Sequence, residues 1–83
     1  MTGKRDAIRA VYRQVDAPTW AAANLDGLAD VLRDLSWLPP GPVEVDVPEM
    51  SDPAERRSVL AVLSRAAAES AGSLRPIRLV RDE

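Results

Sequence analysis

Proline residues divide this 83-residue chain into short segments and limit what each segment can become. The seven prolines are Pro18, Pro39, Pro40, Pro42, Pro48, Pro53 and Pro76. A proline inside a helix removes a backbone hydrogen bond, and the residue before a proline avoids the α region. Regular elements must therefore fit between these positions. A chain of this length makes one small domain with a thin core. The sequence predicts a single domain over residues 1–83.

Two amphipathic helices are predicted ahead of the proline-rich connector at residues 39–42. In the first, over residues 6–15, apolar side chains recur at intervals of three and four. A second helix begins after Asn24, which is a good N-cap, and its buried stripe consists of Leu25, Leu28, Leu32 and Leu35. Gly27 lies inside this helix and weakens it by about 1 kcal/mol relative to alanine.

A strand, a helix and a second strand are predicted after the connector. Residues 42–48 alternate valine with acidic residues between two prolines, which predicts a strand with one buried face. Asp52 caps the third helix, a proline suits its first position, and Gly72 is expected to make its C-terminal turn. Residues 76–80 form the second strand. This order implies a right-handed parallel crossover, so the predicted fold is α/β, with a short parallel sheet packed by about three helices.

The chain contains no cysteine and no histidine. Thiolate nucleophiles, zinc sites built on sulfur and most hydrolase mechanisms that use a histidine base are therefore excluded. No apolar run is long enough to span a membrane, and residues 1–20 lack the apolar core of a signal peptide. We expect a cytoplasmic protein that is not an enzyme and that carries no cofactor and no metal.

Charge is unevenly distributed along the chain, although the net charge is only −2. Residues 18–55 hold eight acidic residues and one base, whereas residues 56–83 hold six arginines and three acids. The acidic middle favours a basic partner and disfavours direct binding of nucleic acid there. The arginines alone do not predict RNA binding, because the chain has only three aromatic residues and no stacking platform.

Three aspartates at intervals of four, Asp26, Asp30 and Asp34, form what we call the acidic ridge. Carboxylates one turn apart repel each other, and a local cost of this kind can mark a functional surface. The alternatives are a solvated helix face, catalysis by paired acids, and a hard-cation site whose spacing does not match calcium loops. Trp20 and Trp37 bracket the ridge, either as core residues or as interface anchors.

The loop before the second helix and the first half of that helix read PTWAAANLDGLAD over residues 18–30. This segment resembles the barstar family, whose members carry a proline after the first helix, an aromatic residue two positions on, and then Asn-Leu-Asp-x-Leu-x-Asp. The likeness extends less specifically over residues 5–80. It implies a small α/β inhibitor that binds a basic secreted ribonuclease, or a related nuclease toxin, and confers immunity inside the producing cell.

The resemblance also implies roles for individual residues. Asp30 matches the aspartate that occupies the phosphate position of the nuclease cleft, Asp26 matches the acid one turn earlier, and Trp20 matches the aromatic that packs on the nuclease. Glu69 matches an acid at the edge of the interface. The expected partner-binding residues are Trp20, Ala22, Asn24, Asp26, Ala29, Asp30, Asp34 and Glu69. The alternative is a barstar-fold interaction or regulatory domain that has lost nuclease inhibition.

The sequence departs from the family pattern in several places. Residues 1–5 are too short and polar to supply the family's first strand, so two alternatives stay open: a sheet reduced to two strands, or a sequence start placed too late. Ala22 replaces a small glycine of the binding loop, Ala29 replaces a large aromatic residue, and Arg65 stands where an interface acid is often found. These changes suggest a different or weakened partner. We expect a monomer, with a dimer through an open strand edge as the alternative.

Overall fold

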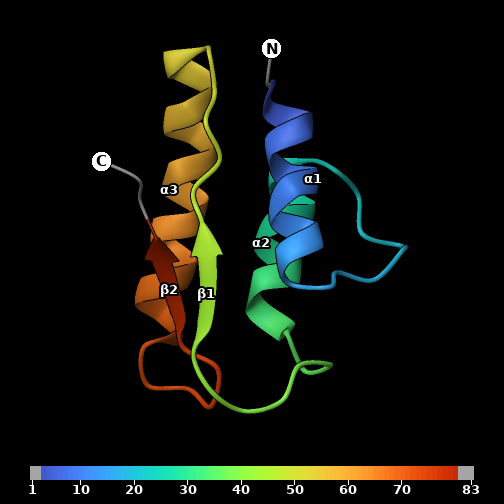
Figure 1. The fold of residues 1–83 in the computed structure, drawn as a ribbon, viewed down its shortest axis with the longest axis vertical. Coiled ribbons are helices and arrows are strands. Elements are labelled where there is room, and N and C mark those ends of the chain that lie inside the picture. Colours follow the sequence, from blue (N-terminus) through green and yellow to red (C-terminus); the bar gives the residue numbers. More distant parts are fainter. Residues whose placement is uncertain (1–2, 81–83) are drawn as a thin grey trace.

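A computed structural model describes residues 3–80 of the chain (Figure 1). The elements, in order, are α1 (Lys4–Gln14), α2 (Leu25–Asp34), β1 (Val43–Asp46), α3 (Pro53–Ser70) and β2 (Ile77–Val80). The two strands are parallel and pair in register, with Val43 opposite Ile77. Three helices and a two-stranded parallel sheet confirm the predicted α/β fold. No helix within residues 3–80 is both long and apolar enough to cross a membrane.

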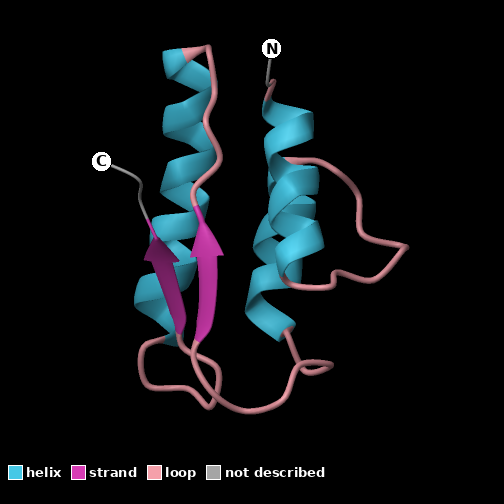
Figure 2. Cartoon of the chain, viewed as in Figure 1, coloured by secondary structure: helices cyan, strands magenta, loops and turns pink. Residues whose placement is uncertain are grey.

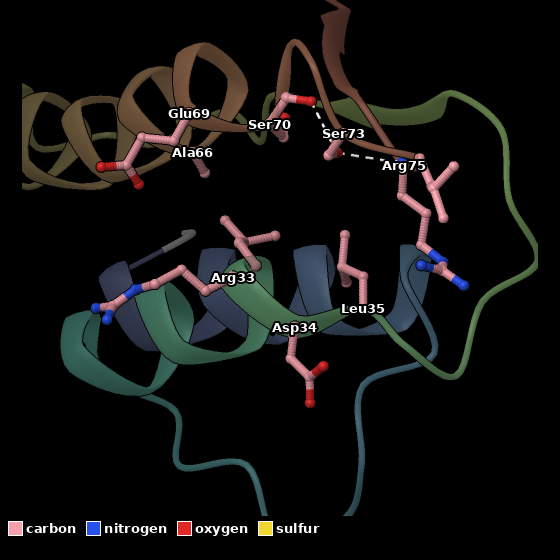
Figure 3. Close-up of a pocket in the computed structure, with 10 residues that line it drawn as sticks. Arg33, Asp34, Leu35, Ala66, Glu69, Ser70, Ser73 and Arg75 are labelled. Atoms are coloured by element: carbon pink, nitrogen blue, oxygen red, sulfur yellow. Dashed lines mark hydrogen bonds between the residues drawn. The ribbon is translucent and has the colours of Figure 1, made fainter.

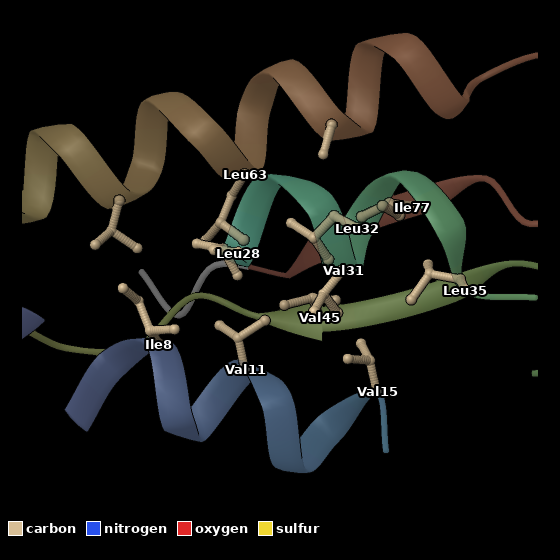
Figure 4. Close-up of a cluster of buried hydrophobic side chains, with 12 residues drawn as sticks. Ile8, Val11, Val15, Leu28, Val31, Leu32, Leu35, Val45, Leu63 and Ile77 are labelled. Atoms are coloured by element: carbon tan, nitrogen blue, oxygen red, sulfur yellow. The ribbon is translucent and has the colours of Figure 1, made fainter. Parts of the chain in front are cut away.

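The hydrophobic core lies between the three helices and one face of the sheet (Figures 2 and 4). β2 lies over α3, and β1 contacts α1. Val45 and Ile77 point inward, whereas Glu44 and Arg78 point to solvent, as the alternating pattern predicts. The inward side chains meet the apolar stripes of the helices: Ile8, Val11, Val15, Leu28, Val31, Leu32, Leu35, Val59, Leu63 and Ala66.

The two predicted N-caps are confirmed. The Asn24 side chain accepts a hydrogen bond from the backbone N–H of Gly27 at 2.7 Å. One carboxylate oxygen of Asp52 accepts from the backbone N–H groups of Ala54 at 2.8 Å and Glu55 at 3.3 Å. Each cap satisfies backbone donors that a helix start leaves without partners. The starts of α2 and α3 are therefore fixed by local sequence.

The expected role of Gly72 at the end of α3 was wrong. Gly72 lies in the turn after the helix, but Gly41 is the only glycine with a positive φ within the described residues. The turn is instead closed by Ser70, whose carbonyl accepts from the Ser73 N–H at 2.9 Å. The Ser70 hydroxyl also accepts from the Ile77 N–H at 2.8 Å, which joins the end of α3 directly to the start of β2.

Candidate protein-binding site

The loop between α1 and α2, residues 16–23, projects away from the helices (Figure 1). Two backbone bonds shape it: the Ala17 N–H donates to the Tyr12 carbonyl at 2.9 Å, and the Ala21 N–H donates to the Pro18 carbonyl at 3.0 Å. Trp20 lies within this loop and is 72% exposed. A large apolar side chain is therefore presented to solvent on a loop with tight local hydrogen bonding.

The loop is attached to α2 through the carbonyl of Ala22. This oxygen accepts from the Asn24 N–H at 2.9 Å and from the Tyr12 hydroxyl at 2.6 Å. Gly27 faces the same point, and a Cβ there would overlap the Ala22 oxygen and come within 3.1 Å of the Tyr12 hydroxyl. The loop can lie on α2 only because residue 27 has no side chain, which accounts for a glycine inside a helix.

The acidic ridge is exposed, as predicted. Asp26, Asp30 and Asp34 are all exposed, and Asp30 forms an ion pair with Arg33 at 3.6 Å. The two side chains of this pair are 66% and 68% exposed, so the pair contributes little to stability and leaves Asp30 available to a partner.

Asp30 lies on the side of α2 that faces the loop attachment. The pKa of the Tyr12 hydroxyl is raised above its ordinary value of 10.0, first by burial and second by the negative charge of Asp30. Gly27 lies against the Ala22 carbonyl and the Tyr12 hydroxyl, and Asp30 follows it by three residues along α2. Residues three apart in a helix share a face, so Asp30 lies on the face of α2 to which the loop is attached.

Glu69 and Ala29 lie on a different feature, a groove between α2 and α3. Two hollows of about 390 and 300 Å³ share Arg33, Ala66 and Glu69 and run along this seam. Glu69 forms an ion pair with Arg65 at 3.4 Å, and Ala29 lines the smaller hollow. Figure 3 shows the groove between the two helices. Glu69 therefore lies across the seam from the ridge.

Asp34 is the member of the ridge farthest along α2 from the loop. It belongs to the last turn of the helix, one turn beyond Asp30. In Figure 3 its carboxylate points away from the groove between α2 and α3. Its place on the helix puts it at the margin of any surface centred on Asp30 and the loop.

The two tryptophans occupy different environments. Trp37 is half-buried against the core, and its indole N–H donates to the Val15 carbonyl at 2.9 Å. It thereby fixes the connector after α2 to the end of α1. The Trp20 side chain, by contrast, is largely exposed to solvent. Of the two roles left open for each residue, Trp37 takes the packing role, whereas the interface role of Trp20 stays a prediction.

The ridge presents carboxylates on a convex helix surface. No group of three or more His, Cys, Asp or Glu side chains within residues 3–80 is placed to hold a metal ion. What such a surface does well is accept charge-assisted hydrogen bonds from arginine and lysine side chains, beside an aromatic contact.

Comparison with protein families gives a match. The family model described as Barstar (barnase inhibitor) matches residues 1–82. This chain belongs to the barstar family. Barstar proteins are an inhibitor family and not a catalytic one, and barnase is the ribonuclease that the description names. Comparisons with curated proteins and with solved structures returned no match.

Sequence reasoning missed two residues that build the site. Tyr12 was assigned only to the apolar stripe of the first helix, and its hydroxyl bond to Ala22 spans ten residues. Gly27 was noted only as a cost to α2. An internal glycine one turn after a loop is a signal of close backbone approach, and it could have pointed to the attachment. The binding roles of the eight predicted residues stay predictions.

Proposed function

We propose that this barstar-family chain inhibits a basic ribonuclease by filling its phosphate-binding cleft with α2 and the loop before it. The observation that carries the proposal is the position of Asp30, which is exposed and lies on the face of α2 to which the loop with the exposed Trp20 is attached. A carboxylate in a cleft lined with arginine and lysine takes the place of a phosphate and receives charge-assisted hydrogen bonds.

Trp20 supplies the apolar part of the proposed contact. Tryptophan is enriched among the few residues that carry most of the binding free energy at interfaces. The loop is held by the Tyr12 and Asn24 bonds to Ala22 before any partner arrives. Less entropy is therefore lost when the loop becomes fixed in a complex, which strengthens binding.

The charge distribution supports a basic partner. Residues 18–55 hold eight acids and one base, and this region includes the whole ridge. Complementary potentials accelerate association and disfavour partners of the wrong charge. We place the activity in the cytoplasm of the cell that makes the nuclease, as an immunity function against a nuclease toxin, and we assign the chain no catalytic step.

The test compares two positions of the ridge in a titration of barnase activity. Asp30→Ala should weaken inhibition by about 2–5 kcal/mol, a range drawn in part from barnase–barstar itself, because basic groups of the nuclease would stay buried without a partner. That is roughly thirtyfold to several thousandfold in affinity. Asp34→Ala, at the margin, should cost at most about 1 kcal/mol and mainly slow association at low salt.

Two outcomes would contradict this proposal. Equal and small effects at both positions would show that the ridge is only a solvated helix face. Absence of inhibition by the unmodified protein, against barnase and a panel of basic secreted ribonucleases, would favour the alternative, a barstar-fold interaction domain without nuclease inhibition.

A further inference from the structure

The two edges of the sheet differ in what they offer to another strand. The Val43 N–H donates to the Pro76 carbonyl at 2.8 Å, and the Val47 N–H donates to the Val80 carbonyl at 3.0 Å. Backbone groups alternate in direction along a strand. In residues 42–48 the even-numbered residues therefore turn their backbone polar groups to the outer edge of β1. On β2 the outward residues are Ile77 and Leu79.

The outer edge of β1 is blocked at three of its four outward positions, which leaves what we call the closed edge. Pro42 and Pro48 have no N–H to offer there. The Gln14 side chain occupies the position of Asp46: its amide nitrogen donates to the Asp46 carbonyl at 3.1 Å, and its amide oxygen accepts from the Asp46 N–H at 2.7 Å. Among the four outward positions, only the N–H of Glu44 has no hydrogen-bond partner within residues 3–80. Prolines and capped backbone groups are ways in which proteins prevent edge pairing.

The outer edge of β2 is open. Its first outward donor, the Ile77 N–H, is taken by the Ser70 hydroxyl at 2.8 Å. Within residues 3–80 the sheet has no strand beyond β2, and the N–H and C=O of Leu79 make no hydrogen bond. Val80, at the end of the strand, is 42% exposed. An unprotected strand edge of this kind is a template for another strand.

We propose that the outer edge of β2 pairs with β2 of a second copy of this chain, antiparallel, about a two-fold axis at Leu79. In this register the two Leu79 residues exchange both backbone hydrogen bonds, as directly opposed residues do in antiparallel pairs. The Ser70–Ile77 bond is left intact. Arg78 of each copy lies opposite Val80 of the other. An axis at residue 78 would instead oppose two arginines, and like charges directly opposite are destabilising.

The residues of α3 beside the outer edge of β2 are small enough to admit a second copy of the chain. Ser70 is on the side of α3 that contacts β2. From helix geometry we infer that the exposed residues farther round from the core, Ser64, Ala68 and Ala71, lie along the open edge. Their small side chains leave room for the same helix of a two-fold partner. A two-stranded sheet is marginal by itself, and pairing makes a sheet of four strands.

The closed edge of β1 makes the pairing self-limiting. In the proposed dimer the two outer strands are both β1, each protected by its own prolines and Gln14. An isologous contact therefore ends at two copies instead of growing into a filament. Because β2 contacts β1 and α3 but not α2, the acidic ridge stays accessible, and the dimer does not depend on the proposed inhibition.

Sedimentation velocity over a range of protein concentrations tests the proposal, with two variants at one exposed position. Val80→Lys places a positive charge opposite Arg78 of the other copy and should weaken the dimer, whereas Val80→Glu should strengthen it. Each change acts twice across the two-fold axis, so we expect shifts of about two- to thirtyfold in dissociation constant, in opposite directions. The exchange rate of the Leu79 amide, measured by NMR, should fall as concentration rises.

Several results would overturn the dimer. These are a single 9.0 kDa species at millimolar concentration, a shift in the same direction for both Val80 variants, or a Leu79 amide whose exchange ignores concentration. Gln14→Ala provides a further check on the closed edge, because it removes the protection of Asp46. That variant should form species larger than a dimer, and a strict dimer would show that Gln14 does not limit assembly.

Discussion

The binding side and the supporting side of this molecule are held by different forces. The loop is held on α2 by polar contacts at one point, where Tyr12 and Asn24 donate to Ala22 above a glycine. In contrast, α3 is held under the sheet by apolar packing around Leu63. We therefore expect substitutions at the loop attachment to cost little stability, whereas substitutions in the apolar core should destabilise the whole domain.

The largest expected effect is on the supporting side. Leu63 is fully buried, and Leu63→Ala should lower the free energy of unfolding by about 2–5 kcal/mol, through lost burial and the cavity left behind. That is a large part of the total for so small a domain. Leu74→Ala is the control, because Leu74 is 70% exposed and its loss should change stability by less than about 0.5 kcal/mol. Urea denaturation measures both, and similar values would contradict the assignment of the core.

The next effect is on the binding side. Gly27→Ala forces the Ala22 carbonyl to move, at a cost of about 1–3 kcal/mol, while the gain in helix propensity returns about 1 kcal/mol to stability. Inhibition of barnase should therefore weaken by about fivefold to 150-fold, with stability changed less. Gly72→Ala is the matched control, since nothing lies within 4 Å of its added Cβ. Unchanged inhibition by Gly27→Ala would show that the loop position does not matter.

Removing one helix cap on each side of the molecule tests whether stability and inhibition can be changed separately. Asn24→Ala and Asp52→Ala each remove a side chain that caps a helix start, and each should cost about 1 kcal/mol of stability. Only the Asn24 variant should also weaken inhibition, because Asn24 lies at the junction of the loop and α2. Thermal unfolding and barnase titration on the same samples measure the two quantities. Equal losses of inhibition would mean that the two sides are not independent.

The smallest expected effect is a dependence of the free energy of unfolding on pH. The pKa of Tyr12 is raised in the folded protein, so the unfolded chain ionises first as pH rises. The stabilisation is fully present below the ordinary pKa of 10.0, and it is lost as pH rises from there through the raised value. Stability measured by urea denaturation should fall over this range in the natural protein and fall less in Tyr12→Phe. Parallel curves for the two proteins would contradict the Tyr12 environment described here.

Much of the fold could be predicted because it depends on local sequence. The caps Asn24 and Asp52, the alternation in β1 and the proline boundaries each act over a few residues. The end of α2 was not predictable in this way, since Leu35 takes a left-handed conformation with φ 44° so that its side chain stays in the core. The role given to Gly72 failed because Ser70 organises that turn, with its carbonyl accepting from Ser73 and its hydroxyl accepting from Ile77 of β2.

The exposed charges of the candidate site could be predicted from the sequence, but the hydrogen bonds that hold its loop and strand could not. Exposure of Asp26 and Asp30 follows from their place opposite the apolar stripe of α2. The bonds from Tyr12 to Ala22 and from Gln14 to Asp46 join residues 10 and 32 positions apart. No periodicity encodes such pairs, because they depend on where α1 packs. The sequence pattern also could not decide between Trp20 and Trp37, since only tertiary contacts distinguish an exposed indole from a half-buried one.

Because the two tryptophans lie in different environments, intrinsic fluorescence can report on folding and on binding separately. Trp37 donates its indole N–H to Val15 beside the core, so its fluorescence reports whether the fold is intact. Trp20 emits from water at the loop, and its spectrum should shift to shorter wavelength when a partner covers it. With two tryptophans in the sequence, replacing either one by phenylalanine leaves a single-tryptophan protein, whose indole can be excited without exciting Tyr12. Folding and association can then be followed separately in solution without any added label.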